Sequence, residues 1–210
     1  METLLALAGI LFAALIGAMS PGPSFLFVAR TAMSASRRSG LAAAAGMGVG
    51  GFVFAVLAIL GLKAVFASHP WLYSLVKLGG GLYLAYIGVQ MWRGAKNPVA
   101  ALPAAAAGQS TRRSFALALA TQLSNPKTAI FYGSIFAALL PQNPGPLVTV
   151  VLPVAVLLIE LGWYTVVALA LSAAAPRAVY LRAKTAIDRT AGAVMGLLGL
   201  KLVTAVDTAS

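Results

Sequence analysis

Two short proline-containing motifs are the places in this sequence where residue types and spacing could do chemistry. The first is Ser20-Pro21-Gly22-Pro23-Ser24, and the second, Ser124-Asn125-Pro126-Lys127, follows about 104 residues later. Each interrupts an apolar run that otherwise predicts a helix, because proline removes a backbone donor and clashes with the carbonyl one turn earlier. Within a bilayer, freed backbone groups are tolerated only where protein or a water-filled cavity satisfies them. We therefore expect both breaks to line a cavity, and two broken helices at matching places indicate a transporter site.

Both breaks can also start a new helix whose N-terminus points at the cavity. Ser20 can cap a helix that begins at Pro21, or the helix can begin at Gly22-Pro23. In the second motif, Asn125 can cap a helix that begins at Pro126. A helix N-terminus carries about half a positive charge and suits a carboxylate or a phosphate.

Two charged residues would give this cavity opposite poles. Lys127 lies in the first turn of the second new helix, where the helix dipole disfavours a cation, and Glu160 lies near the centre of a later apolar run. An ionisable residue inside the membrane is by default functional. We predict an amino acid bound with its carboxylate towards the breaks and Lys127 and its ammonium towards Glu160. The alternative is a Lys127–Glu160 ion pair that only locks two helices together.

The candidate substrate-binding residues are Ser20, Pro21, Gly22, Pro23, Ser24, Asn125, Pro126, Lys127 and Glu160. The candidates for coupling transport to an ion are Glu160, Lys127 and Lys77. Lys77 lies in the third apolar run, where it either faces inward or extends its ammonium outward along its apolar stem.

The composition is that of an integral membrane protein. Of the 210 residues, 60% are hydrophobic and 9% are charged, whereas a soluble domain carries about 25% charged residues. Cysteine is absent from the sequence, which excludes disulfides and thiolate metal sites, and one histidine and four acids leave little for metal or acid–base chemistry. We expect no cofactor and no resident metal. The net charge of +11 is attributed to basic loops on one membrane face and not to nucleic-acid binding.

Six apolar stretches, each near the roughly 20 residues needed to cross a bilayer, predict an all-α membrane protein. They lie at about 4–28, 42–66, 71–92, 114–139, 147–172 and 189–206. A long linker at residues 94–113 separates two three-helix halves, 1–93 and 114–210. The first and fourth helices are the broken ones, which is the pattern of two inverted repeats.

Loop charges predict the orientation of the helices. The linkers after stretches one, three and five carry three, four and four Lys/Arg, whereas those after two and four carry one, Lys63, and none. Because basic loops stay in the cytoplasm, we expect the odd linkers inside, both termini outside and the second half inverted. A competing layout makes the first stretch re-entrant, with the N-terminus inside and five true spans. The sequence begins Met1-Glu2, without the basic region of a signal peptide, and the first stretch is interpreted as retained.

Small residues four apart predict faces where helix backbones approach closely. Gly46 with Gly50, and Gly192 with Gly196, form two such faces. For the first pair, packing within one chain is favoured over a dimer interface, and a homodimer stays an open alternative.

The two breaks, together with the stretch Leu78-Gly79-Gly80-Gly81-Leu82-Tyr83-Leu84-Ala85-Tyr86-Ile87-Gly88, resemble the lysine exporter family of amino-acid effluxers, which includes homoserine, threonine and leucine exporters. The resemblance extends from the first break to Gly196-Leu197-Leu198-Gly199. It implies a bacterial inner-membrane exporter and not an enzyme, driven by the proton gradient, with an amino acid and protons as its partners. The family's functional positions carry over to Pro21, Gly22, Pro23, Asn125, Pro126 and Lys127.

The sequence departs from this family in its second apolar stretch. Many members carry an acid and a histidine there in a Gly-Asp-x-x-His pattern, at the positions that Gly51 and Phe54 occupy here. The departure argues against a basic substrate and leaves Glu160 as the main acid within the membrane. We expect a neutral amino acid or a close derivative as substrate.

Three other functions compete with export of amino acids. A divalent-metal exporter would need clustered carboxylates, histidines or thiolates, and a membrane-embedded lipid enzyme would need an acid pair or a nucleophile with its base. A passive channel could use the same broken helices. Coupling of flux to a pH gradient would distinguish a carrier from a channel.

Overall fold

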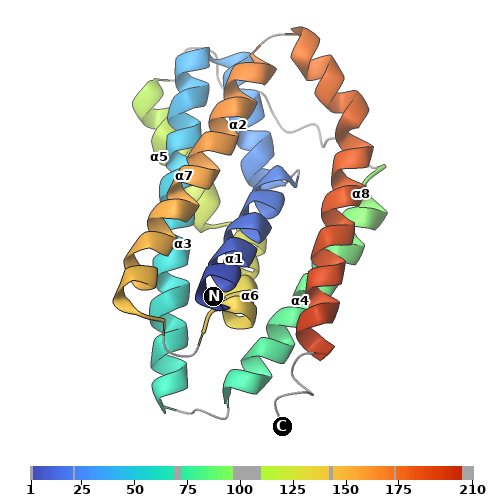
Figure 1. The fold of residues 1–210 in the computed structure, drawn as a ribbon. Helices are drawn as coiled ribbons and strands as arrows, with labels where there is room; N and C mark the ends of the chain where they lie inside the picture. Colours follow the sequence, from blue (N-terminus) through green and yellow to red (C-terminus); the bar gives the residue numbers. More distant parts are fainter. Residues whose placement is uncertain are drawn as a thin grey trace.

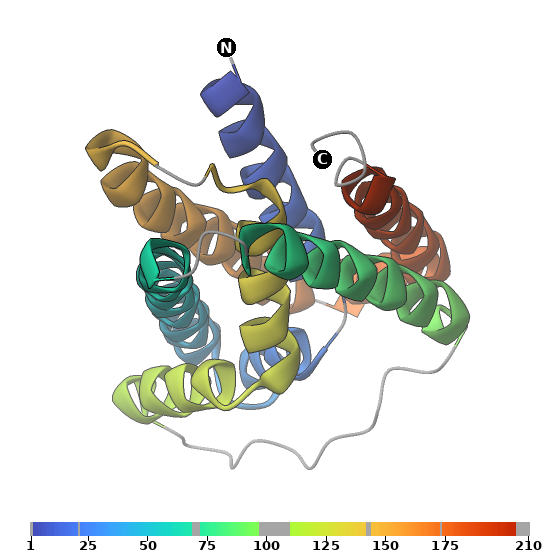
Figure 2. The ribbon, with the colours of Figure 1, turned by 90° about the horizontal axis from the view of Figure 1, so that it is seen from below.

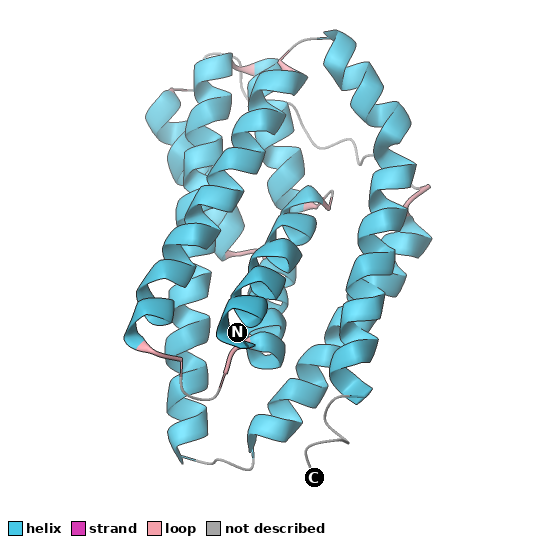
Figure 3. Cartoon of the chain, in the orientation of Figure 1, coloured by secondary structure: helices cyan, strands magenta, loops and turns pink. Residues whose placement is uncertain are grey.

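The computed structural model is helical throughout the residues that it describes, which are 2–20, 22–68, 72–96, 110–141, 144–172 and 174–204 (Figures 1 and 3). The helices are α1 (Glu2–Met19), α2 (Pro23–Ser34), α3 (Arg37–Ser68), α4 (Leu72–Gly94), α5 (Thr111–Leu123), α6 (Pro126–Leu139), α7 (Pro146–Leu171) and α8 (Ala174–Thr204). The prediction of an all-α protein is confirmed. Both predicted breaks are present, because α1 ends before α2 and α5 ends before α6 at the proline motifs.

The first break bends the chain by 55° between α1 and α2. Gly22 is the N-cap of α2 in an extended conformation, and Pro23 follows in the first turn, where its missing N–H and fixed φ are compatible with a helix. Of the two predicted starts, the structure therefore has the one at Gly22-Pro23. Ser20 closes the preceding helix by donating its backbone N–H to the carbonyl of Gly17 at 3.2 Å. Pro21 lies outside the described residues.

The second break forms as the sequence predicts. Asn125 is the N-cap of α6, its side-chain oxygen accepts the backbone N–H of Lys127 at 3.1 Å, and Pro126 follows in the first turn. A side-chain cap of this kind satisfies one of the orphan donors of a helix N-terminus. Lys127 therefore lies in the first turn of α6.

The helices pack in pairs around α6. Contacts join α3 to α7 and α4 to α8, and α6 contacts α1, α3 and α4 in the middle of the molecule (Figure 2). A Cβ on Gly88 would lie 2.5 Å from the nitrogen of Gly196 and 2.6 Å from the carbonyl of Gly192, and a Cβ on Gly46 would lie 2.5 Å from the carbonyl of Phe115. Backbones approach this closely only where side chains are missing. Both glycine faces are therefore used within the chain, as was favoured for Gly46.

The described helices are suited to a bilayer. Two of them are long and apolar enough to cross a membrane, residues Arg37–Ala64 of α3 and Pro146–Leu171, and the bent pair α1–α2 would count as a third span. Large apolar side chains are exposed on the outside of the bundle, among them Leu57, Leu147 and Leu197 at 58%, 75% and 68%. Apolar surface of this extent in a monomer marks contact with lipid or another protein.

Two helix limits differ from the sequence prediction. The predicted last stretch began at residue 189, but α8 begins at Ala174 and takes in most of the segment that was expected to be a basic linker. Hydropathy marks only the apolar part of a helix. The polar part of α8 is also helical, and its Lys184 and Thr185 donate hydrogen bonds to the carbonyl of Ala95, just beyond the end of α4. Similarly, α3 begins at Arg37, whereas the predicted stretch began at residue 42.

The buried apolar side chains form two clusters. One is built mainly on α1, α4, α6 and the first part of α7, and includes Ile87, Tyr132 and Leu152. The other joins α2 to α3, α5 and the last part of α7, and includes Phe25 and Tyr164. Five polar side chains of the breaks and their neighbours are buried as well: Ser20, Ser24, Gln122, Asn125 and Glu160. Buried polar groups in such a setting require partners, and those partners define the site.

Candidate functional site

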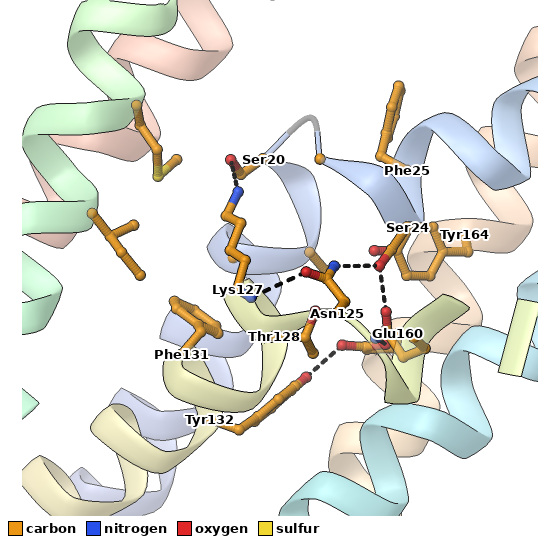
Figure 4. A pocket seen from close by; sticks show the side chains of 16 residues that line it. Ser20, Ser24, Phe25, Asn125, Lys127, Thr128, Phe131, Tyr132, Glu160 and Tyr164 are labelled. Carbon is orange, nitrogen blue, oxygen red and sulfur yellow. Dashed lines mark hydrogen bonds between the residues drawn. The ribbon is translucent and has the colours of Figure 1, made fainter. Parts of the chain in front are cut away.

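Both helix breaks open into one pocket (Figure 4). Its lining comes from α1 and the first break, α2, α4, the end of α5, the second break, α6 and α7. The space measures about 460 Å³, counting the part that opens outward. The lining residues are Gly17, Ala18, Ser20, Gly22, Ser24, Phe25, Ile87, Met91, Gln122, Asn125, Lys127, Thr128, Phe131, Tyr132, Glu160 and Tyr164. The two breaks, more than a hundred residues apart in sequence, are thus parts of a single site.

Lys127 links the second break to the first. Its Nζ donates a hydrogen bond to the Oγ of Ser20 at 2.9 Å (Figure 4). A Cβ on Gly22 would lie 3.5 Å from the same Nζ, so the ammonium lies directly beside the turn that begins α2. Lys127, in the first turn of α6, therefore also lies beside the N-terminus of α2.

A chain of buried hydrogen bonds leads from the second break to Glu160. The Nδ2 of Asn125 donates to the Oγ of Ser24 at 3.1 Å, and Ser24 donates in turn to the Oε1 of Gln122. The Nε2 of Gln122 donates to the Oε2 of Glu160 at 2.7 Å. From the other side, the hydroxyl of Tyr132 donates to the Oε1 of Glu160 at 2.6 Å. Figure 4 labels four members of this chain, Asn125, Ser24, Glu160 and Tyr132.

All donors in this chain point towards the carboxylate. Each hydrogen bond polarises the next one in the same direction, because the interior has a low dielectric. Both oxygens of Glu160 accept a short hydrogen bond from a neutral donor, and the side chain is only 3% exposed. Among the described residues, neutral donors thus hold both oxygens, and no cation contacts the carboxyl group. Such an acid can receive an ammonium group or a proton without first giving up an ion pair.

Lys127 and Glu160 do not form the ion pair that was the alternative interpretation. Lys127 donates to Ser20, while Glu160 accepts from Tyr132 and Gln122. Both side chains nevertheless line the same pocket. The positive and negative poles predicted from the sequence are therefore present and separate.

The departure from the family pattern lies at the acid itself. A Cβ on Gly51 would lie 2.8 Å from the Cδ and 2.9 Å from the Oε2 of Glu160, so only glycine leaves room for this carboxyl group. Phe54 stacks on Tyr132, with ring centroids 6.4 Å apart. The two replaced positions on α3 thus pack against Glu160 and against the tyrosine that holds it.

The structure brings together most of the predicted site residues and adds others. Ser20, Gly22, Ser24, Asn125, Lys127 and Glu160 line the pocket, and Pro23 and Pro126 begin the helices beside it. Pro21 and the side chain of Lys77 lie outside the described part of the structure.

Gln122 and Tyr132 were missed as polar site residues. Gln122 could have been noticed as an uncharged polar residue close before the second break. The sequence does not show that the hydroxyl of Tyr132 reaches Glu160 of α7.

Broken helices whose new N-termini face a buried polar pocket are typical of membrane transporters. Comparison with known proteins gives the family: residues 15–206 match the family described as LysE type translocator. The chain belongs to this family.

Its relatives include the threonine efflux protein of Escherichia coli K12, which is 37% identical over 191 residues, 90% of this chain and 93% of that protein. The threonine efflux protein of Salmonella typhimurium LT2 is 38% identical over 192 residues, with the same coverage. The homoserine/homoserine lactone efflux protein of Salmonella typhimurium is 31% identical over 127 residues, 60% of this chain and 61% of that protein. No solved structure matches the chain.

Proposed function

We propose that this protein is a secondary active transporter that exports neutral amino acids or close derivatives across the cytoplasmic membrane of a bacterium. The single observation that carries the proposal is the pocket between the two breaks, whose lining includes the basic side chain of Lys127 and the acidic side chain of Glu160. The relatives named for threonine efflux and for homoserine efflux support the same substrate class. Ser20, Gly22, Ser24, Asn125 and the helix starts at Pro23 and Pro126 complete the proposed binding site.

The charges of the pocket favour a zwitterion without further charge. Among the described lining residues, Lys127 and Glu160 are the charged ones. A substrate carboxylate would replace Ser20 as the partner of Lys127 and would also meet the N-termini of α2 and α6, which suit an anion. The ammonium would then take a carboxylate oxygen of Glu160. A basic side chain would need a second acid, which these lining residues do not offer.

Glu160 is the proposed point of coupling to protons. Its carboxylate can accept either the ammonium of the substrate or a proton, and the two would compete for the same oxygens. Competition of this kind at a buried acid produces exchange of substrate for protons, and buried acids are the usual proton carriers of transporters. Lys127 and Lys77 remain further candidates for coupling.

The proposed architecture is six spans arranged as two inverted three-helix repeats. Each half contains a broken helix followed by two others: α1–α2, α3 and α4, which end at Gly94, and α5–α6, α7 and α8, which begin at Thr111. The equivalent helices α3 and α7 contact each other, as do α4 and α8, which is the arrangement expected around a pseudo-twofold axis. Residues 94–113 would connect the halves in the cytoplasm.

The proposed orientation places the basic linkers in the cytoplasm and both termini in the periplasm, by the positive-inside rule. The competing layout, with a re-entrant first stretch, remains to be distinguished by accessibility of the N-terminus. A homodimer would need a surface other than the glycine faces, because Gly46 and Gly192 face neighbouring helices of the same chain.

Replacement of Glu160 by glutamine tests the proposal. The variant keeps the size of the side chain but cannot carry negative charge or a proton, so gradient-driven efflux of labelled threonine from vesicles should fall to background. Lys201→Gln is the matched control, since Lys201 is an exposed cation in the last turn of α8. Both proteins should elute as folded species at equal levels. Threonine efflux by E160Q at the wild-type rate would sink the assignment of Glu160.

A further inference from the structure

One hydroxyl in the pocket has no hydrogen-bond partner within the described part of the chain. Thr128 of α6 lines the pocket and is labelled in Figure 4, yet its Oγ1 bonds to no described residue. Threonines within a helix often bond the carbonyl one turn earlier, as Thr31 does with Phe27 at 2.8 Å and Thr149 with Gly145 at 3.2 Å. Thr128 makes no such bond, so its hydroxyl is available to a ligand.

The Oγ1 of Thr128 is also accessible. The enclosed polar side-chain atoms without a partner among the described residues belong to Trp163, Asp188 and Arg189, and the half-buried Thr128 is not one of them. A hydroxyl that can be reached from the pocket can bond to water until a ligand replaces that water. The unpaired state of Thr128 therefore needs no compensation inside the protein.

The other polar side chains of the pocket are already engaged. Lys127 bonds to Ser20, and Tyr164 bonds to Ser24. The remaining ones belong to the chain of hydrogen bonds that ends at Glu160, namely Ser24, Asn125, Gln122 and Tyr132. Among the described lining residues, Thr128 is thus the polar side chain that the protein itself leaves unused.

The position of Thr128 on α6 places it on the side of the acid. Asn125 precedes it by three residues and Tyr132 follows it by four, and these spacings put all three on one face of a helix. Asn125 begins the chain of hydrogen bonds to Glu160, and Tyr132 donates to Glu160 directly. Lys127 leaves the helix about 100° away from Thr128. Thr128 therefore shares the face that leads to Glu160.

We propose that Thr128 determines specificity by hydrogen-bonding a hydroxyl on the side chain of the substrate, so that hydroxylated neutral amino acids are the preferred class. The inference rests on the proposed function and narrows its substrate class. In a β-hydroxy amino acid the hydroxyl and the ammonium are on adjacent carbons. With the ammonium at Glu160, the hydroxyl is therefore close to the same face of α6. The hydroxyl of Thr128 can donate to it or accept from it.

An apolar wall alone would not make this distinction. Phe25, Ile87, Met91 and Phe131 form much of the apolar lining, and they suit the methyl groups of valine as well as the methyl group of threonine. A site separates two side chains of the same shape only if it offers a partner to the polar one. Threonine and valine are therefore the pair of probes that isolates the contribution of Thr128.

Thr128→Val removes the hydroxyl and keeps the shape of the side chain. Wild-type protein in vesicles should have a lower KM for the efflux of labelled threonine than of labelled valine. T128V should raise the KM for threonine by about three- to tenfold, the effect of one neutral hydrogen bond. Its KM for valine should stay within about twofold of wild type. An equal rise for both substrates would indicate a merely structural role, and unchanged values for both would leave the hydroxyl without a function; either result would overturn the inference.

Two further variants control for packing. Thr128→Ser keeps the hydroxyl, and its KM for threonine should stay within about twofold of wild type. Thr165→Val makes the same replacement at a half-buried threonine of α7 that is not part of the pocket lining, and it should leave both KM values unchanged. A rise in T128S or T165V equal to that in T128V would also refute the inference. Where T128V inserts poorly, Thr128→Ala gives the same comparison, because it too lacks the hydroxyl.

The wild-type protein separates this inference from the proposed function. Saturable efflux of threonine and valine with equal KM values would leave the exporter intact and refute the role of Thr128. If folded wild-type protein transports neither amino acid, the proposed function is refuted and the inference falls with it.

Discussion

Replacing Gly51 by alanine should displace the acid at the centre of the site without touching any charged residue. The new Cβ would lie 2.8 Å from the Cδ of Glu160, so the carboxyl group must retreat by about 0.6 Å to reach an ordinary contact of 3.4 Å. Its hydrogen bonds from Tyr132 and Gln122 are 2.6 and 2.7 Å long. A retreat of that size takes them to roughly 3.2 Å, at or beyond the useful limit.

The expected functional loss is large for so small a change. A displacement of this order in a binding constellation costs about 10- to 100-fold in efficiency, so we expect G51A to lose that much in the initial rate of threonine efflux at low substrate concentration. Gly61→Ala is the control on the same helix, because nothing lies within 4 Å of its Cβ position. Vesicles should contain equal amounts of each protein, measured by quantitative immunoblot. If G51A and G61A transport equally well, the reasoning about Gly51 and Glu160 is refuted.

Three further changes separate the parts of the account. Tyr132→Phe removes one donor to Glu160 and should lower efflux by about tenfold. Tyr86→Phe, at a tyrosine that is 55% exposed, should leave efflux unchanged. Equal efflux rates in the two variants would contradict the role of the Tyr132 hydroxyl. Lys127→Met should raise KM for threonine by about tenfold or more and leave the inhibition constant of threonine amide almost unchanged; a parallel loss for both compounds would remove Lys127 from the carboxylate site. Gly88→Ala should force α4 away from α8, since the new Cβ would lie 2.5 Å from the nitrogen of Gly196. The change should lower the free energy of unfolding by about 1–3 kcal/mol. Gly79→Ala, with open space at its Cβ, should have the melting temperature of wild type.

The helices and the breaks could be predicted from the sequence because both depend on local chemistry. Proline cannot continue a helix, and Asn125 before Pro126 is a strong N-terminal signal. The start at Gly22-Pro23 was one of two local solutions, and tertiary packing selected it. The extent of α8 could not be predicted, because hydropathy ends where charge begins, while Lys184 is buried by contacts with α4.

The poles of the site were also visible in the sequence, but the way they are held was not. Lys127 and Glu160 are conspicuous because charge within an apolar run is expensive. Lys127 and Glu160 have separate hydrogen-bond partners. Ser20 bonds to Lys127, whereas Gln122 and Tyr132 bond to Glu160. Such contacts join residues far apart in sequence, and no local pattern specifies them.

Efflux of radiolabelled amino acids from preloaded vesicles, with and without an imposed pH gradient, tests the central claim most directly. The panel should contain neutral amino acids such as threonine and homoserine, together with basic and acidic ones. The account predicts saturable, gradient-dependent efflux of neutral amino acids. An absence of amino-acid flux by folded wild-type protein, under either condition, would contradict the zwitterion site and the proposed function together.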